Sequence, residues 1–85
     1  MKKLAKLDEY RPRLVDVGAG DKTQIIEVPV TGLSDPTITD VVSNCVNSKD
    51  GIYAFGQEWK YIDAFVVKQR GETFIRIYVK DDENA

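Results

Sequence analysis

The feature that most constrains the fold is residues 61–82, YIDAFVVKQRGETFIRIYVKDD. Two stretches rich in β-branched and aromatic residues flank Arg70 and Gly71, a pattern typical of two antiparallel strands joined by a tight turn. Because successive side chains of a strand point to opposite faces, this hairpin carries apolar side chains on both faces. The rest of the chain therefore has to cover one face, and the other face needs an explanation.

Two registers of this hairpin fit the sequence. A two-residue Arg70-Gly71 turn pairs positions whose numbers sum to 141 and sorts the side chains cleanly. A three-residue turn, residues 69–71, shifts the sum to 140 and mixes the faces, although it spares Arg70 the costly left-handed conformation. We favour the two-residue turn, which makes one face almost wholly aliphatic: Ile62, Ala64, Val66, Ile75, Ile77 and Val79.

The opposite face of the hairpin, here called the second face, is then aromatic with interleaved charges. Aromatic and arginine side chains are enriched in protein-binding patches, because they supply contact area and directed contacts at a low entropic cost. We therefore expect this face to bind a partner or a second copy of the chain, through six candidate residues: Tyr61, Phe65, Phe74, Arg76, Tyr78 and Lys80.

One helix is predicted over residues 35–46. Asp35 followed by Pro36 is a helix start signal, and residues 47–51 contain residue types that end helices. The apolar residues between them recur at helical spacing and form one stripe: Ile38, Val41, Val42, Cys45 and Val46. This stripe is expected to pack on the aliphatic face of the hairpin and to bury the Cys45 thiol.

The remaining segments are predicted to be strands. Residues 13–17 and 23–30 form a hairpin around GAGDK, with Pro29 near a strand end or sheet edge. Residues 52–55 form a short strand, residues 56–58 a tight loop, and residues 59–68 and 72–80 the last two strands. The expected fold is a small single α+β domain over residues 11–80, ordered β-β-α-β-β-β, with a C-terminal three-stranded antiparallel meander packed on one helix. Residues 1–10 are expected to be a flexible basic arm and residues 81–85 an acidic tail.

Composition limits the function. A chain of 85 residues holds one core, and it has no apolar run long enough to span a membrane, so we expect a cytoplasmic protein without membrane association. A net charge of -2 and a pI near 5.0 disfavour nucleic acid as the partner. One cysteine and no histidine leave no disulfide within the chain, and we expect no metal and no cofactor.

The stretch LVDVGAGDK, residues 14–22, resembles the first motif of class I S-adenosylmethionine methyltransferases, in which a strand ends in an acidic residue and a glycine-rich turn leads into a helix. Here TQIIEVPVTG follows, which is a strand pattern and not a helix that could present amides to a ligand. The stretch is therefore interpreted as a hairpin loop.

Since no histidine is present to act as a general base and Cys45 is expected to be buried, the chain is not predicted to be an enzyme. We expect a small protein-interaction module, an adaptor, inhibitor or assembly subunit, that binds through the aromatic second face or a strand edge and can self-associate. The alternative is a single-stranded nucleic-acid binder, in which the aromatics stack bases while Arg76, Lys80 and the basic N-terminal arm hold phosphates.

Overall fold

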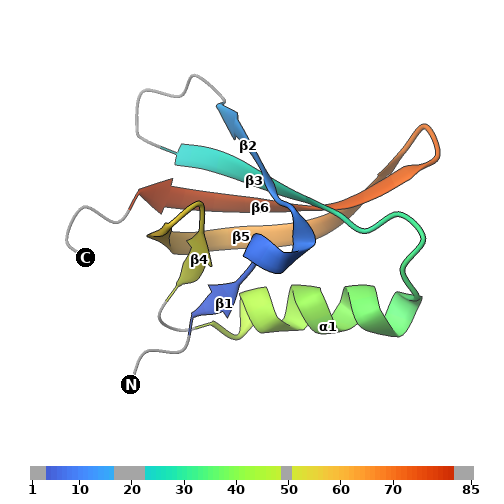
Figure 1. The fold of residues 1–85 in the computed structure, drawn as a ribbon, viewed down its shortest axis with the longest axis horizontal. Helices are drawn as coiled ribbons and strands as arrows, with labels where there is room; N and C mark the ends of the chain where they lie inside the picture. The colour runs from blue at the N-terminus through green and yellow to red at the C-terminus, as the bar shows by residue number, and fades with distance from the viewer. Residues whose placement is uncertain (1–3, 17–22, 49–50, 82–85) are drawn as a thin grey trace.

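The computed structural model of the chain describes residues 4–16, 23–48 and 51–81. Within these ranges one α-helix, a short 3-10 helix and six strands follow one another (Figure 1). In chain order they are β1 (Ala5–Lys6), η1 (Asp8–Tyr10), β2 (Arg13–Asp16), β3 (Thr23–Pro29), α1 (Asp35–Val46), β4 (Ile52–Ala54), β5 (Gln57–Gln69) and β6 (Glu72–Asp81).

The strands form one mixed sheet in the order β1-β4-β5-β6-β3-β2. β4, β5 and β6 are the predicted antiparallel meander, β3 adds antiparallel to β6, and β2 adds antiparallel to β3. The predicted α+β class and the β-β-α-β-β-β order are confirmed, and β1 is one further strand ahead of them. β6, the last strand in the sequence, therefore lies in the interior of the sheet (Figure 1).

The N-terminal segment belongs to the domain from residue 4 onward. β1 pairs parallel with β4, through hydrogen bonds from Ala5 N to Gly51 O (3.1 Å) and from Leu7 N to Tyr53 O (3.1 Å). The Leu7 side chain is only 2% exposed and joins the core. The structure thus differs from the expected arm that makes few contacts, because Ala5 and Leu7 supply apolar area that the short helix cannot. Residues 1–3 and 82–85, the ends of the expected arm and acidic tail, lie outside the described residues.

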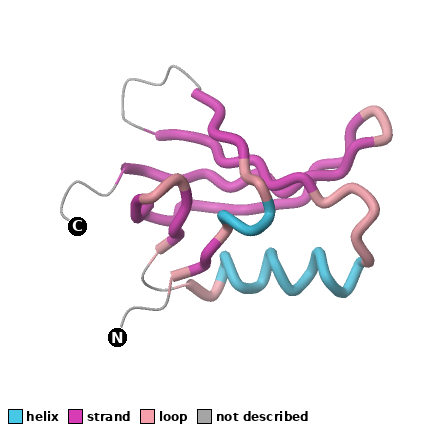
Figure 2. The backbone as a smooth tube through the Cα atoms, in the orientation of Figure 1, coloured by secondary structure: helices cyan, strands magenta, loops and turns pink. Residues whose placement is uncertain are grey.

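The helix α1 has the predicted bounds, but its N-cap lies one residue before Asp35. Ser34 is the N-cap and its hydroxyl accepts a hydrogen bond from Thr37 N (3.4 Å), so Asp35 and Pro36 occupy the first turn instead. Val41 and Cys45 are buried, Ile38 and Val42 pack partly against the core, and Val46 is exposed. The predicted stripe is correct except at Val46. Figure 2 shows α1 running along β5, with the β5–β6 hairpin extending beyond the other strands.

The β5–β6 register follows the two-residue turn near its tip. Gln69 pairs with Glu72, and both turn residues have positive φ, 51° at Arg70 and 78° at Gly71, as a type I′ turn requires. The β4–β5 turn uses the same device at Phe55 (φ 56°) and Gly56 (φ 75°), so that the predicted 56–58 loop is wrong and Gln57 already belongs to β5.

A β-bulge at residue 62 ends the predicted register. Asp63 pairs with Tyr78, but Tyr61 pairs with Val79, so Ile62 is the extra residue and is 45% exposed. Beyond the bulge the two sets of side chains are exchanged. Tyr61 consequently lies on the α1 side and packs against the core, which corrects its assignment to the second face.

The core lies between the sheet and α1, and Tyr10 of η1 packs against it. Ile75, Ile77 and Val79 of β6 are fully buried at its centre, beside Ile26 and Val28 of β3. Of the six aliphatic residues expected under the helix, Ala64 is only partly buried, while Ile62 and Val66 remain 45% and 41% exposed. The helix of twelve residues runs along β5 but leaves Ile62 and Val66 of that strand in solvent.

Two valines of α1 test this packing. Replacing Val41 (3% exposed) by Asp places an unpaired charge in the core and should lower the free energy of unfolding by on the order of 4 kcal/mol. The matched substitution Val46→Asp changes a valine that is 51% exposed and should cost less than about 1 kcal/mol. Urea unfolding followed by far-UV circular dichroism measures both, and equal losses would contradict the described burial.

The contribution of β1 can be measured in the same way. Truncating Leu7 to Ala should cost about 2 to 4 kcal/mol, because it removes buried methyl groups and leaves a cavity. Leu14 on β2 is 46% exposed and serves as the control, since Leu14→Ala removes the same atoms from a solvated position. A Leu7→Ala variant as stable as the Leu14→Ala variant would show that the N-terminal segment does not belong to the core.

Candidate protein-binding surface

The second face of the sheet is opposite α1, and no helix of the described residues covers it. The β3–β6 and β5–β6 registers place four of the six candidate residues next to one another on this face, and Lys80 follows them along β6. Tyr61 is the exception, because the bulge at Ile62 turns its side chain to the α1 side of the sheet. The four residues that the registers bring together are Phe65, Phe74, Arg76 and Tyr78.

Phe74 is covered by charged side chains of the same chain. It is only 5% exposed, and the guanidinium carbons of Arg76 and Arg13 lie 5.5 and 6.0 Å from its ring centroid. Such cation–π contacts stabilise a ring that would otherwise be in water. In this chain by itself Phe74 is therefore part of the structure and presents almost no surface to a partner.

A carboxylate of β3, that of Glu27, holds the two arginines in place, and its side chain is 14% exposed. Its Oε1 lies 3.3 Å from Arg13 Nη2, and its Oε2 lies 3.3 Å from Arg76 Nη2. Arg13 Nη2 also lies 3.0 Å from Glu72 Oε1. The cross-strand pairs Arg13–Glu27 and Glu27–Arg76 place these groups side by side. Arg76 is thus committed to an internal ion pair, and the charges of this cluster nearly balance.

Farther from the Arg70-Gly71 turn than Phe74, the second face carries an aromatic pair, the exposed Phe65 and the half-buried Tyr78. Phe65 is 41% exposed and its ring centroid lies 5.6 Å from that of Tyr78, at an interplanar angle of 33°. Lys80 lies on the same face and pairs directly with Lys60 of β5, and both lysines are exposed. Two like charges side by side repel each other and would be relieved by an acidic group of a partner.

Sequence reasoning missed Arg13, Glu27 and Glu72. The predicted hairpin of residues 13–30 already places Arg13 opposite Glu27, so this ion pair could have been predicted from the sequence. The contact of Glu27 with Arg76 depends on β3 adding to β6 across 49 positions of sequence, and no pattern in a single sequence specifies that partner. The GAGDK loop was interpreted as a hairpin turn, and residues 17–22 lie outside the described residues.

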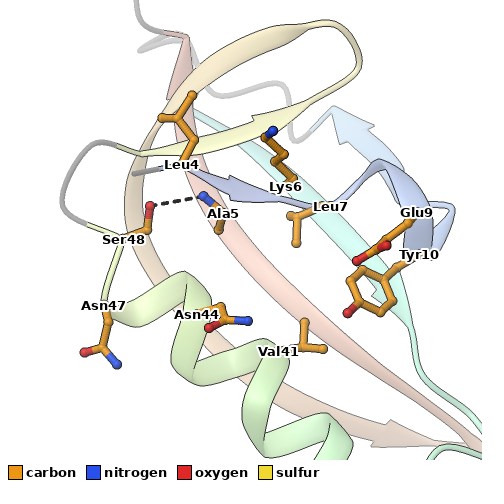
Figure 3. Close-up of a pocket in the computed structure, with 10 residues that line it drawn as sticks. All are labelled: Leu4, Ala5, Lys6, Leu7, Glu9, Tyr10, Val41, Asn44, Asn47 and Ser48. Atoms are coloured by element: carbon orange, nitrogen blue, oxygen red, sulfur yellow. Dashed lines mark hydrogen bonds between the residues drawn. The ribbon is translucent and has the colours of Figure 1, made fainter. Parts of the chain in front are cut away.

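A separate hollow of about 430 Å³ lies between the N-terminal segment and α1 (Figure 3). Ala5 N donates a hydrogen bond to Ser48 Oγ (3.3 Å) across it, and amides of Asn44 and Asn47 line its helix side. Burial and the neighbouring Glu9 raise the pKa of Tyr10, which keeps this phenol protonated. Tyr10 is therefore not poised to act as a base near neutral pH.

Cys45 lies in the core beneath this hollow. It is fully buried, and burial raises the pKa of its thiol from an ordinary value of 9.0 to about 11. In the described ranges no group of three or more His, Cys, Asp or Glu side chains is placed to hold a metal ion. Neither helix of the described residues has the length and apolar character needed to cross a membrane.

Comparisons with protein-family models, with curated proteins and with solved structures find no match to this chain. The surface itself is therefore the basis for an assignment of function.

The thiol of Cys45 makes stability depend on pH at alkaline values. Its pKa is higher in the folded than in the unfolded chain, so the neutral thiol contributes fully below pH 9, and the contribution is lost as the pH rises from 9 to 11. The free energy of unfolding should fall by about 2 to 3 kcal/mol more in the wild type than in Cys45→Ala over this interval. Chemical denaturation at pH 8, 9, 10 and 11 measures the difference, and identical slopes would contradict it.

Proposed function

We propose that this protein is a small interaction module that works by binding another protein, and not by catalysis. Its contact surface comprises the exposed Phe65 and the half-buried Tyr78 of the second face, together with the adjacent part of strand β5. The observation that carries the proposal is the exposure of Phe65, 41%, on a sheet face without a covering helix, where a rigid aromatic side chain can be buried by a partner at little entropic cost.

The charges around this pair set the kind of partner. Lys60 and Lys80 lie at one end of the exposed surface, while the arginines at the other end are neutralised by Glu27 and Glu72. A partner that presents an apolar pocket with an acidic group beside it would complement this arrangement. Arg76 and Phe74 do not touch the partner in this proposal. Their cluster supports binding indirectly, because it holds β6 in position next to the contact surface.

The same lysine pair favours a second candidate, a single-stranded nucleic acid whose bases stack on Phe65 and Tyr78. Two lysines supply few phosphate contacts, Phe74 is buried, and the chain has a net charge of -2. We therefore rank this function second.

Capture of proteins from a lysate of the source cells by the immobilised chain tests the leading proposal. We expect Phe65→Asp to reduce the captured partner at least about tenfold, because a charge at the centre of an apolar contact costs more than about 1.4 kcal/mol. The control is Val46→Asp, which places the same charge at an exposed position of α1, 51% compared with 41% at Phe65. Equal capture by both variants would overturn the proposed surface.

Titration of a fluorescent single-stranded oligonucleotide decides between the two candidates. Nucleic-acid binding should depend on Lys80 and weaken steeply with added salt, since each phosphate contact releases counterions. We expect no saturable binding at physiological ionic strength. Tight, salt-sensitive binding that Phe65→Asp abolishes would replace the leading proposal with the second.

A further inference from the structure

Strand β5 has one open edge over most of its length. It pairs with β6 from Gln69 back to Trp59, whereas on its other side β4 reaches only Gln57, Glu58 and Trp59. Among the described residues no strand lies beyond positions 60–69 on that side, and in Figures 1 and 2 β5 continues well past β4. An edge of this length is a ready template for another strand.

The alternation of the ladder identifies which backbone groups face outward. Thr73 O accepts from Val30 N (2.9 Å), so Thr73, and with it every second residue of β6, directs its backbone groups toward β3. The residues opposite these on β5 direct theirs away from β6, as antiparallel pairing requires. They are Lys68, Val66 and Ala64.

Apart from the Ala64 N–H, the structure gives these outward groups no hydrogen bond within the described part of the chain. Ala64 N donates to the carboxylate of Asp63 (2.9 Å), and the structure gives no hydrogen bond to the N–H or C=O of Val66 or Lys68 on the open side. Both of these residues are exposed, although α1 runs along the same strand. The open edge therefore offers hydrogen-bonding groups at strand spacing, which an extended backbone satisfies and a helix or a small molecule does not.

The side chains of this segment are apolar on both faces. Phe65 on the second face and Val66 on the α1 face are each 41% exposed. Protective features lie only at its ends, namely the bulge at Ile62 and the lysines at positions 60 and 68. Residues 64–67 are consequently a short regular part of this edge that lacks the charges and bulges with which proteins usually prevent strand addition.

We propose that the β5 edge of a second copy of this chain pairs antiparallel with this segment, across a twofold axis at Val66. This inference rests on the proposed binding role and gives it a first partner. Val66 then lies opposite Val66 of the second copy, Ala64 opposite Lys68, and Phe65 opposite Val67. Each outward-facing residue then lies opposite another, Phe65, Val66 and Val67 meet apolar side chains, and no like charges face each other.

Neighbouring registers are worse for identifiable reasons. A shift in one direction brings the bulge at Ile62 into the ladder, and a shift in the other places Ala64 opposite Arg70, which belongs to the turn. A further shift sets Lys68 against its own copy, where like charges repel. The self-complementary register at Val66 is the reason to choose a second copy over an unrelated peptide.

A single cysteine tests the position of the axis. In a hydrogen-bonded antiparallel pair the Cα atoms lie about 5.5 Å apart, within reach of a disulfide, so Val66→Cys should cross-link to its own copy on mild oxidation. The control Lys68→Cys lies on the same edge, but its two copies would be about 13 Å apart at about 3.3 Å per residue, too far for the bond. The native Cys45 is fully buried and does not compete.

We expect disulfide-linked dimer to form at least about tenfold faster from Val66→Cys than from Lys68→Cys, as judged by non-reducing electrophoresis. Sedimentation velocity at rising concentration provides the second measurement. The wild type should dimerise, Val66→Lys should remain a monomer because it sets like charges against each other, and Leu14→Lys on the far edge strand β2 should dimerise like the wild type.

Equal cross-linking rates, or a wild type that stays monomeric at every concentration, would overturn the edge pairing. A dimer that Leu14→Lys abolishes and Val66→Lys preserves would move the contact to β2 and overturn it as well. Failure of the proposed function is distinguishable, because it appears as partner capture that Phe65→Asp leaves unchanged, whatever the state of association.

Discussion

The structure depends on how one short helix can bury one face of a six-stranded sheet. α1 contributes Val41 and Cys45 to the core and lies along β5, which leaves the more distant strands to be covered by something else. The chain solves this with its own first residues, because β1 and η1 bring Leu7 and Tyr10 onto the same face before β2 begins at the opposite end of the sheet. The apolar area removed from water by these two contributions together is what stabilises the fold.

The opposite face is treated in a different way. There the chain places no helix among the described residues, and it protects Phe74 with Arg13 and Arg76, themselves held by Glu27. Long charged side chains can cover apolar surface with their stems while their charged ends stay in water. The cover extends over one end of the hairpin only, so that Phe65 and the open edge of β5 remain available, and the two proposed contacts are neighbours on one exposed region.

Much of the local structure could be predicted from the sequence, because it is set by signals that lie close together. The stripe on α1, the hairpin at Arg70-Gly71 and the three C-terminal strands each follow from periodicity or from turn residues within about twenty positions. The α+β class followed from their order. The two-residue turn that places Arg70 in the left-handed conformation was also predicted, because only this turn sorts apolar and polar side chains onto separate faces.

The errors share one physical cause, which is that the deciding partner lies far away in the sequence. β1 is two residues long and has no pattern of its own; it exists because β4, some 47 positions later, offers a parallel edge. The bulge at Ile62 leaves no mark that distinguishes it from a regular strand, and it moved Tyr61 to the core. For the candidate site the aromatic face was found, whereas the burial of Phe74 depends on Glu27 and Arg13, which reach it only after β3 has paired with β6.

The interior position of β6 also sets the order of events when the protein is made. Both β3 and β5 use it as their partner, so that a nascent chain on the ribosome has two sets of unsatisfied strand edges until residue 81 has emerged. Strands whose central partner arrives last cannot close a stable sheet early, and apolar segments such as those of β3 stay exposed during synthesis. The domain is thus expected to fold only after β6 has emerged, in one cooperative step, and a chain that lacks β6 has no strand to join β3 to β5.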